Sequence, residues 1–289
     1  MDALETAPSV EGAPGKRTPG RAGRNLPAAI AVGLVLAALV VVPLYSPFRW
    51  AFIGVLVAAA ALGTWEVVQA LRRLGARPPL APLLVGGAAM VVLAYRSGPE
   101  LLVLALVLTV LACMAARLLD PARGYLRDAS AAAFTAAYVP FLAGFAALLA
   151  QPGDGPRRVT VFIATVVCSD VGGYAAGVLF GRHPLAPTVS PKKSWEGVGG
   201  SVLACTVAGA IFFSVLLHAS PLLGVLYGLA VVGTATLGDL GESMIKRDIG
   251  IKDMGDLLPG HGGLMDRLDS LLPTAPVAFL LLSAFVPLP

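Results

Sequence analysis

Acidic and basic side chains gather in one stretch near the C-terminal end of an otherwise apolar sequence. Residues 239–269 contain seven carboxylates, four Lys or Arg side chains and one His. Carboxylates bind hard divalent cations such as Mg²⁺, which share an oxygen-only shell with substrate phosphates. Lys and Arg side chains offset the repulsion between anionic substrates. We therefore interpret this stretch as a site for phosphoryl chemistry rather than as an ordinary charged connection.

The spacing within this stretch supports that interpretation. Asp239, Glu242, Ser243 and Lys246 are spaced at i, i+3, i+4 and i+7, so they share one face of a helix. Asp266 and Asp269 are likewise spaced at i, i+3. The glycines that surround His261 allow backbone amides to turn toward a ligand. A phosphomonoester substrate is itself a nucleophile, so the chemistry requires no Ser-His-Asp triad.

A second polar position is Asp170, which lies near the middle of an apolar helix predicted over residues 159–181. A carboxylate there costs about 2.5–3.5 kcal/mol on insertion scales. Gly173, Gly177 and Gly181 recur every four residues on the same face and allow another backbone to approach closely. Two interpretations stay open: a packing helix whose Asp170 is hydrogen-bonded to a neighbour, and a helix whose Asp170 lines a polar cavity open to the cytoplasm.

The third polar stretch is Ser190-Pro191-Lys192-Lys193-Ser194-Trp195-Glu196-Gly197, a predicted loop that leads into an apolar helix. Adjacent lysines at a membrane surface are often topological anchors. Here they also lie beside a helix N-terminus, where backbone amides and the helix dipole favour an anion. Lys192 and Lys193 are therefore candidates for phosphate binding as well as for anchoring.

The elements that carry these residues are predicted to cross a membrane. Hydrophobic residues make up 57% of the 289 residues and charged residues only 13%, whereas a globular domain has about 25% charged residues. A helix needs about 20 mainly apolar residues to span the hydrocarbon core. The sequence predicts an all-α, polytopic membrane protein with nine transmembrane helices, over residues 27–45, 50–70, 80–96, 100–118, 131–150, 159–181, 197–218, 222–245 and 270–287.

The distribution of basic residues predicts the orientation of these helices. With nine spans and the N-terminus inside, 17 of the 21 Lys and Arg residues fall on the inner side, leaving Arg49, Arg96, Arg157 and Arg158 outside. The C-terminus then lies outside, and the polar stretches face the cytoplasm. Residues 1–26 are predicted to form a disordered basic tail, and residues 27–289 a single transmembrane catalytic domain.

The polar stretches together resemble the phosphatidate cytidylyltransferases, or CDP-diacylglycerol synthases. The run from Ser243 to Asp269, S-x-I-K-R-x4-K-D-x-G-x2-L-P-x-H-G-G-L-x-D-R-L-D, is similar to the pattern of that family without a mismatch. Residues 190–197 resemble its Ser-Pro-Lys-Lys-Thr-Trp-Glu-Gly, with Ser194 in place of Thr. Residues 169–174 resemble Ser-Asp-Thr-Gly-Ala-Tyr, but Val171 replaces Thr and removes a hydroxyl beside Asp170. The resemblance covers about residues 165–270; upstream it rests on the span count and the Trp65-Glu66 pair.

The resemblance implies a reaction, its cofactors and its partners. The phosphate of phosphatidate attacks the α-phosphorus of CTP, releasing pyrophosphate and CDP-diacylglycerol. It implies Mg²⁺, with K⁺ as a further cation, and a homodimer in the bacterial inner membrane; no nucleic-acid partner is expected. Carried over to this sequence, it makes Asp239 and Asp266 metal ligands. The other implied site residues are Asp170, Lys192, Lys193, Ser243, Lys246, Arg247, Lys252, Asp253, His261, Arg267 and Asp269.

Two other interpretations stay open from the sequence. The chain could act on another lipid, as an isoprenoid-lipid cytidylyltransferase or a CTP-dependent lipid kinase, because the residues do not reveal the lipid pocket. An ion-coupled transporter is the alternative outside enzymes. Against a transporter, the charges gather at one membrane face rather than at the midplane, and no inverted repeat is found.

Overall fold

The protein is a bundle of long helices, seen here in a computed structural model that describes residues 26–118, 123–255, 257 and 262–287. The predicted tail, residues 1–26, lies outside this range except for Leu26. The elements are α1 (Leu26–Tyr45), α2 (Trp50–Arg73), α3 (Leu80–Ser97), α4 (Pro99–Arg117), α5 (Tyr125–Ala136), the π-helix η1 (Ala137–Phe141), α6 (Leu142–Ala150), α7 (Gly155–Phe180), β1 (Pro184–Ala186), β2 (Ser190–Ser194), α8 (Trp195–Val215), α9 (Pro221–Ile249), α10 (Met265–Leu268) and α11 (Leu271–Phe285).

Within the described residues, eight helices are long and apolar enough to cross a membrane. They correspond to the second through ninth predicted spans, so the polytopic all-helical architecture is confirmed. The first predicted span coincides with α1, whose 20 residues contain no charged side chain. The helices often extend past the predicted boundaries: α7 begins at residue 155 rather than 159, and α9 continues to residue 249. Helical hydrogen bonding continues where the apolar pattern has already stopped.

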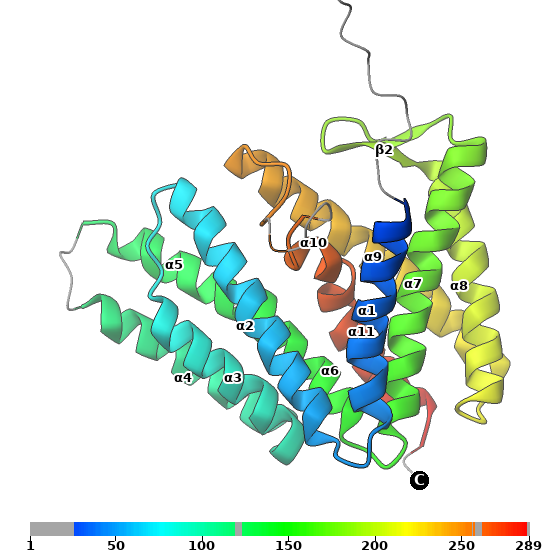
Figure 1. Ribbon diagram of the computed structural model, residues 1–289, viewed down its shortest axis with the longest axis horizontal. Helices are drawn as coiled ribbons and strands as arrows, with labels where there is room; N and C mark the ends of the chain where they lie inside the picture. The colour runs from blue at the N-terminus through cyan, green and yellow to red at the C-terminus, as the bar shows by residue number, and fades with distance from the viewer. Residues whose placement is uncertain (1–25, 119–122, 256, 258–261, 288–289) are drawn as a thin grey trace, which may run out of the picture.

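Two groups of helices flank the short C-terminal elements. Figure 1 shows α2 to α5 on one side of the bundle and α7 and α8 on the other, while α9 crosses obliquely between them beside α10 and α11. Glycines allow the close packing of α7 on α8: a Cβ atom added at Gly173 would lie 2.6 Å from Ser201 Oγ, and one at Gly172 would lie 2.7 Å from the Gly200 carbonyl oxygen. The close approach predicted for the glycine face of residues 173–181 is therefore confirmed.

The connection predicted as a loop between α7 and α8 contains a small β-hairpin. Strands β1 and β2 pair antiparallel, with Pro184 opposite Ser194 and Ala186 opposite Ser190. Helix α8 begins directly after β2. Figure 1 shows this hairpin at the end of the bundle where α1 begins and α9 ends, while the C-terminus lies at the opposite end.

Arg158, one of the basic residues outside the predicted positive-inside pattern, is a buried structural residue. Its side chain is 2% exposed, and its Nε atom lies 2.9 Å from both carboxylate oxygens of Asp154. Its Nη atoms donate to the carbonyl oxygens of Leu282, Val286 and Pro287, at 2.9, 3.0 and 3.2 Å. Arg158 thus binds backbone carbonyl groups at and just after the C-terminal end of α11, where helical hydrogen bonding ends.

Replacing Arg158 with Ala is expected to lower the stability of the folded bundle strongly. Removing one partner of a buried ion pair costs about 3–5 kcal/mol, and here it would leave the Asp154 carboxylate, only 16% exposed, without this cation. Thermal unfolding in detergent should show a clearly lower Tm for Arg158→Ala. Arg157→Ala is the matched control, since Arg157 is exposed in the next position of the same helix. Equal Tm values for the two variants would contradict this structural role.

Candidate active site

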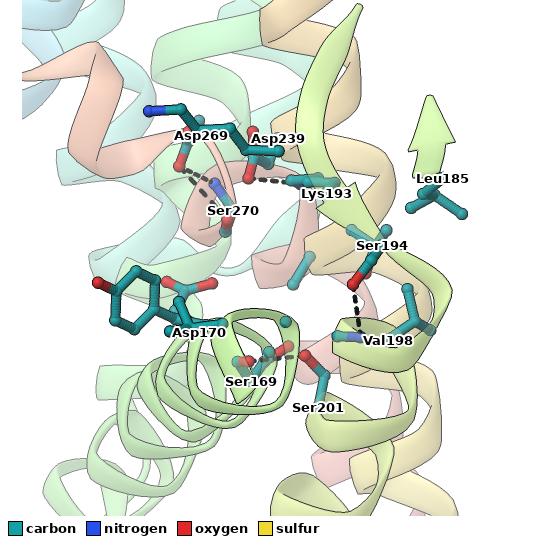
Figure 2. Close-up of a pocket in the computed structure, with 18 of the residues that line it drawn as sticks. Ser169, Asp170, Leu185, Lys193, Ser194, Val198, Ser201, Asp239, Asp269 and Ser270 are labelled. Atoms are coloured by element: carbon teal, nitrogen blue, oxygen red, sulfur yellow. Dashed lines mark hydrogen bonds and ion pairs between the residues drawn. The ribbon is translucent and has the colours of Figure 1, made fainter. Parts of the chain in front are cut away.

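A cavity of about 600 Å³ collects the polar side chains that the sequence places on separate elements. Its walls come from α7, the β-hairpin with the start of α8, the middle of α9, and the segment from α10 into α11 (Figure 2). The residues that were predicted for the site and line this cavity are Asp170, Lys192, Lys193, Asp239, Asp266, Arg267 and Asp269. Asp170 thus lines a polar cavity, as one of its two interpretations predicts.

Asp170 lies closer to one end of its helix than the sequence suggests. Helix α7 ends at Phe180, ten residues after Asp170, or about 15 Å at 1.5 Å per residue. The backbone carbonyl of the preceding Ser169 accepts a hydrogen bond from Ser201 Oγ at 2.7 Å, which fixes α7 against α8 at this level. Asp170 itself remains open to the cavity (Figure 2).

The hairpin supplies cations at the cavity wall. Lys193 Nζ lies 2.5 Å from a carboxylate oxygen of Asp239, and Lys192 lines the same wall. The next residue, Ser194, caps α8: its hydroxyl accepts a hydrogen bond from the Gly197 amide at 3.1 Å. The lysines therefore stand directly before a helix N-terminus, as the sequence predicts, and in this structure one of them is paired with a site carboxylate.

Helices α9 and α11 approach each other closely at the site. A Cβ atom added at Gly238 would lie 2.5 Å from the backbone oxygen of Asp269. Asp269 Oδ1 accepts from the amide of Ser270 at 2.7 Å and from its hydroxyl at 3.3 Å. Asp170, Asp239 and Asp269 all line the same cavity. The site thus concentrates negative charge, which a bound cation would neutralise.

Lys246 connects Asp266, which lines the cavity, with Glu242, which does not. Its Nζ atom lies 2.8 Å from Asp266 Oδ1 and 3.1 Å from Glu242 Oε1. Asp266 Oδ2 in turn accepts from the backbone amides of Met254 and Gly263, at 3.0 and 2.8 Å. Lys246, one of the site residues that the resemblance implies, here holds Asp266 in place. The Glu242 side chain on its other side is fully buried.

Among the described residues, Ser243, Arg247, Lys252 and Asp253 were predicted for the site but do not line the cavity. Ser243 Oγ donates to Asp239 Oδ1 at 3.4 Å. Arg247 Nε donates to the carbonyl oxygen of Val189 at 3.3 Å, which ties the hairpin to the end of α9. Lys252 and Asp253 are exposed on the connection after α9. His261 lies outside the described residues, so its predicted role stays a prediction.

The carboxylates at the cavity are suited to Mg²⁺ when substrate phosphates complete its shell. In the described part of the chain, no three His, Cys, Asp or Glu side chains converge closely enough to hold a metal by themselves. Mg²⁺ is usually bound by one or two carboxylates together with phosphates and waters. Asp239 and Asp266 both line the cavity and offer the required oxygen atoms, with Asp269 beside them.

Sequence reasoning missed several small polar residues of the cavity. Ser201, Thr236 and Ser270 line it without belonging to the polar stretches first identified, whereas Ser169 belongs to the stretch around Asp170. Ser and Thr are common in apolar helices, because their hydroxyls bond to the preceding turn, so Ser201 and Thr236 give no distinct signal. Ser270 could have been found from its position directly after Asp269.

Comparison with known proteins gives close relatives over most of the chain. Residues 27–285 match the profile of the cytidylyltransferase family. A phosphatidate cytidylyltransferase of Mycobacterium leprae is 47% identical over 285 residues, covering 93% of this chain and 90% of the relative. One of Mycobacterium bovis is 45% identical over 277 residues, covering 91% and 90%. One of Haemophilus influenzae is 39% identical over 148 residues, covering 48% and 51%.

Proposed function

The chain belongs to the cytidylyltransferase family, and on that premise we propose that it makes CDP-diacylglycerol and pyrophosphate from CTP and phosphatidate. The proposal rests on one observation: a single cavity is lined by both carboxylates and lysines, and its rim is apolar. The lysines and Arg267 suit the phosphates of two anionic substrates. The carboxylates suit the divalent cation that such substrates bring or require.

The reaction requires positioning more than covalent chemistry. An oxygen of the phosphatidate phosphate forms a bond to the α-phosphorus of CTP, while the α–β anhydride bond breaks and pyrophosphate leaves with the electron pair. The attacking phosphate is already anionic, so the enzyme must mainly reduce repulsion and align the two groups. Lys192, Lys193 and Arg267 bind the phosphates in this scheme. Mg²⁺, held through Asp239 and Asp266, would neutralise charge on the departing pyrophosphate.

The cavity rim suits a substrate that remains in the membrane. Tyr174 and Val178 of α7 line the cavity, yet their side chains are 75% and 66% exposed on the outside of the bundle. Leu185 of the hairpin and Val198 of α8 add further apolar lining. A phosphate headgroup can therefore reach the carboxylates and lysines while its acyl chains stay among lipids beside α7.

A panel of lipid phosphates tests the lipid specificity. Purified protein should release pyrophosphate from CTP when phosphatidate is added, at least tenfold faster than with a polyprenyl phosphate or with diacylglycerol. A faster rate with the polyprenyl phosphate would assign the protein to another lipid. Substantial CTP consumption with diacylglycerol would favour a lipid kinase.

The orientation in the inner membrane belongs to the same proposal. We place the cavity on the cytoplasmic side, because CTP is cytoplasmic and because 17 of 21 basic residues lie on that side of the nine predicted spans. A homodimer is proposed as well, on the family resemblance alone. In the proposed orientation, the hairpin and the connection between α8 and α9 lie on opposite sides of the membrane.

Cysteine labelling tests this orientation. Thr188→Cys on the hairpin and Ser220→Cys before α9 are introduced singly into a background without Cys113, Cys168 and Cys205. In intact spheroplasts, an impermeant maleimide should label position 220 and should label position 188 only after lysis. Labelling of both positions from the same side would contradict the proposed topology.

A further inference from the structure

Glu66 is a buried carboxylate on α2, far in sequence from the polar stretches of the site. Only 1% of the Glu66 surface is exposed. Glu66 Oε1 accepts a hydrogen bond from the Leu264 amide at 2.9 Å, and Oε2 accepts one from the Met265 amide at 2.8 Å. These bonds join residues 198 and 199 positions apart. A residue of the N-terminal half thus holds the backbone that leads into Asp266.

Glycines around Glu66 leave the space that its carboxylate occupies. A Cβ atom added at Gly263 would lie 2.7 Å from Glu66 Oε1, and one added at Gly255 would overlap the same oxygen. One turn earlier on α2, a Cβ atom at Gly63 would lie 3.1 Å from the sulfur of Met265, which is fully buried. Helix α2 therefore offers both a space for the Met265 side chain and a carboxylate for its amide.

The backbone that Glu66 holds is continuous with the hydrogen bonds of Asp266. Gly263, directly before the bonded amides, donates its own amide to Asp266 Oδ2 at 2.8 Å. Met254, beside Gly255, donates to the same oxygen at 3.0 Å. The other carboxylate oxygen, Asp266 Oδ1, lies 2.8 Å from Lys246 Nζ. A shift of the backbone at residues 263–265 would therefore turn Asp266 away from the cavity.

We propose that Glu66 is a positioning residue for the reaction: it holds the backbone at Leu264 and Met265, where the glycine-rich connection ends, and through that backbone the orientation of Asp266. The inference rests on the proposed function for its catalytic consequence, but the hold on the backbone is independent of it. Both carboxylate oxygens are needed, because each accepts from a different amide. A displacement of about 1 Å at a catalytic group can cost about a hundredfold in rate.

Glu66→Gln tests this role with little change in size. One of its two terminal atoms becomes an NH₂ group, which cannot accept from an amide, so one anchor is lost. We expect kcat for CDP-diacylglycerol formation to fall about 10- to 100-fold, with the KM for CTP changed less than about threefold. Tryptic cleavage after the exposed Lys252, measured in detergent, should become several-fold faster. Glu100→Gln, an exposed carboxylate at the start of α4, is the matched control and should change neither.

A second variant keeps the test decisive if Glu66→Gln does not fold. Gly255→Ala leaves the sequence of α2 unchanged, and its added methyl group displaces the Glu66 carboxylate from the opposite side. This variant should also show the lower kcat and the faster cleavage after Lys252. Unchanged kcat, or a loss of kcat without faster cleavage after Lys252, would overturn the positioning role. If the wild-type protein makes no CDP-diacylglycerol, the proposed function fails instead, and faster cleavage in the variant alone still reports whether Glu66 holds the connection.

Discussion

Asp239→Asn is expected to abolish most CTP turnover while leaving the protein folded and inserted. Asp239 reaches the cavity from α9, where it pairs with Lys193 and accepts from Ser243. Asn keeps the size of the side chain but removes the charge that a hard divalent cation requires. We expect kcat/KM to fall at least about a hundredfold, which corresponds to about 2.7 kcal/mol. The Mg²⁺ concentration needed for the remaining activity should rise.

The matched control for this variant is Asp248→Asn, an exposed carboxylate on the same helix that does not line the cavity. It should retain wild-type kcat and wild-type Mg²⁺ dependence. Asp266→Asn should behave like Asp239→Asn if both residues bind one ion. Near-normal activity with unchanged Mg²⁺ dependence in either variant would remove that residue from the metal site, and Asp269 would be the next candidate.

Changing Lys192 and Lys193 together to Gln is expected to produce the other large loss. In the structure Lys193 neutralises Asp239, and both lysines face the space that anionic phosphates would fill. Without these charges, the repulsion between substrate phosphates and the site carboxylates is no longer offset. We expect kcat/KM for CTP to fall at least about a hundredfold, with an increased KM as part of that loss.

A nearby basic residue separates phosphate binding from membrane anchoring. Arg182→Gln removes an exposed positive charge just before the hairpin and should leave the kinetics nearly unchanged. The double lysine variant should still insert, since many other basic residues remain on the inner side. Normal specific activity combined with poor insertion of the double variant would show that the lysines act as anchors.

The sequence predicts the helical membrane architecture well, because long apolar segments are a property of local composition. It also identifies seven residues that line the cavity, since a carboxylate or lysine beside apolar helices stands out from its surroundings. The contact of Gly172 with Gly200 could be expected from small residues on a helix face. These features are encoded within single segments.

Pairings between distant segments could not be predicted in the same way. Nothing local distinguishes Lys246, which holds Asp266, from Lys193, which pairs with Asp239 at the cavity wall. Glu66 is recognisable as a polar residue near the end of a span, but its partners lie almost 200 residues later. In the sequence, Arg158 is an exception to the predicted distribution of basic residues. Its position is explained only by the structure, in which it is buried against the end of α11.

The fate of the CTP phosphates tests the central claim most directly. Purified protein in phosphatidate-containing detergent micelles is given CTP labelled at either the α- or the γ-phosphorus. Nucleotidyl transfer to phosphatidate predicts that the α-label enters the lipid fraction, that the γ-label is released as pyrophosphate, and that the two products form in equal amounts. Entry of the γ-label into lipid, or pyrophosphate release that continues without phosphatidate, would contradict the proposed function.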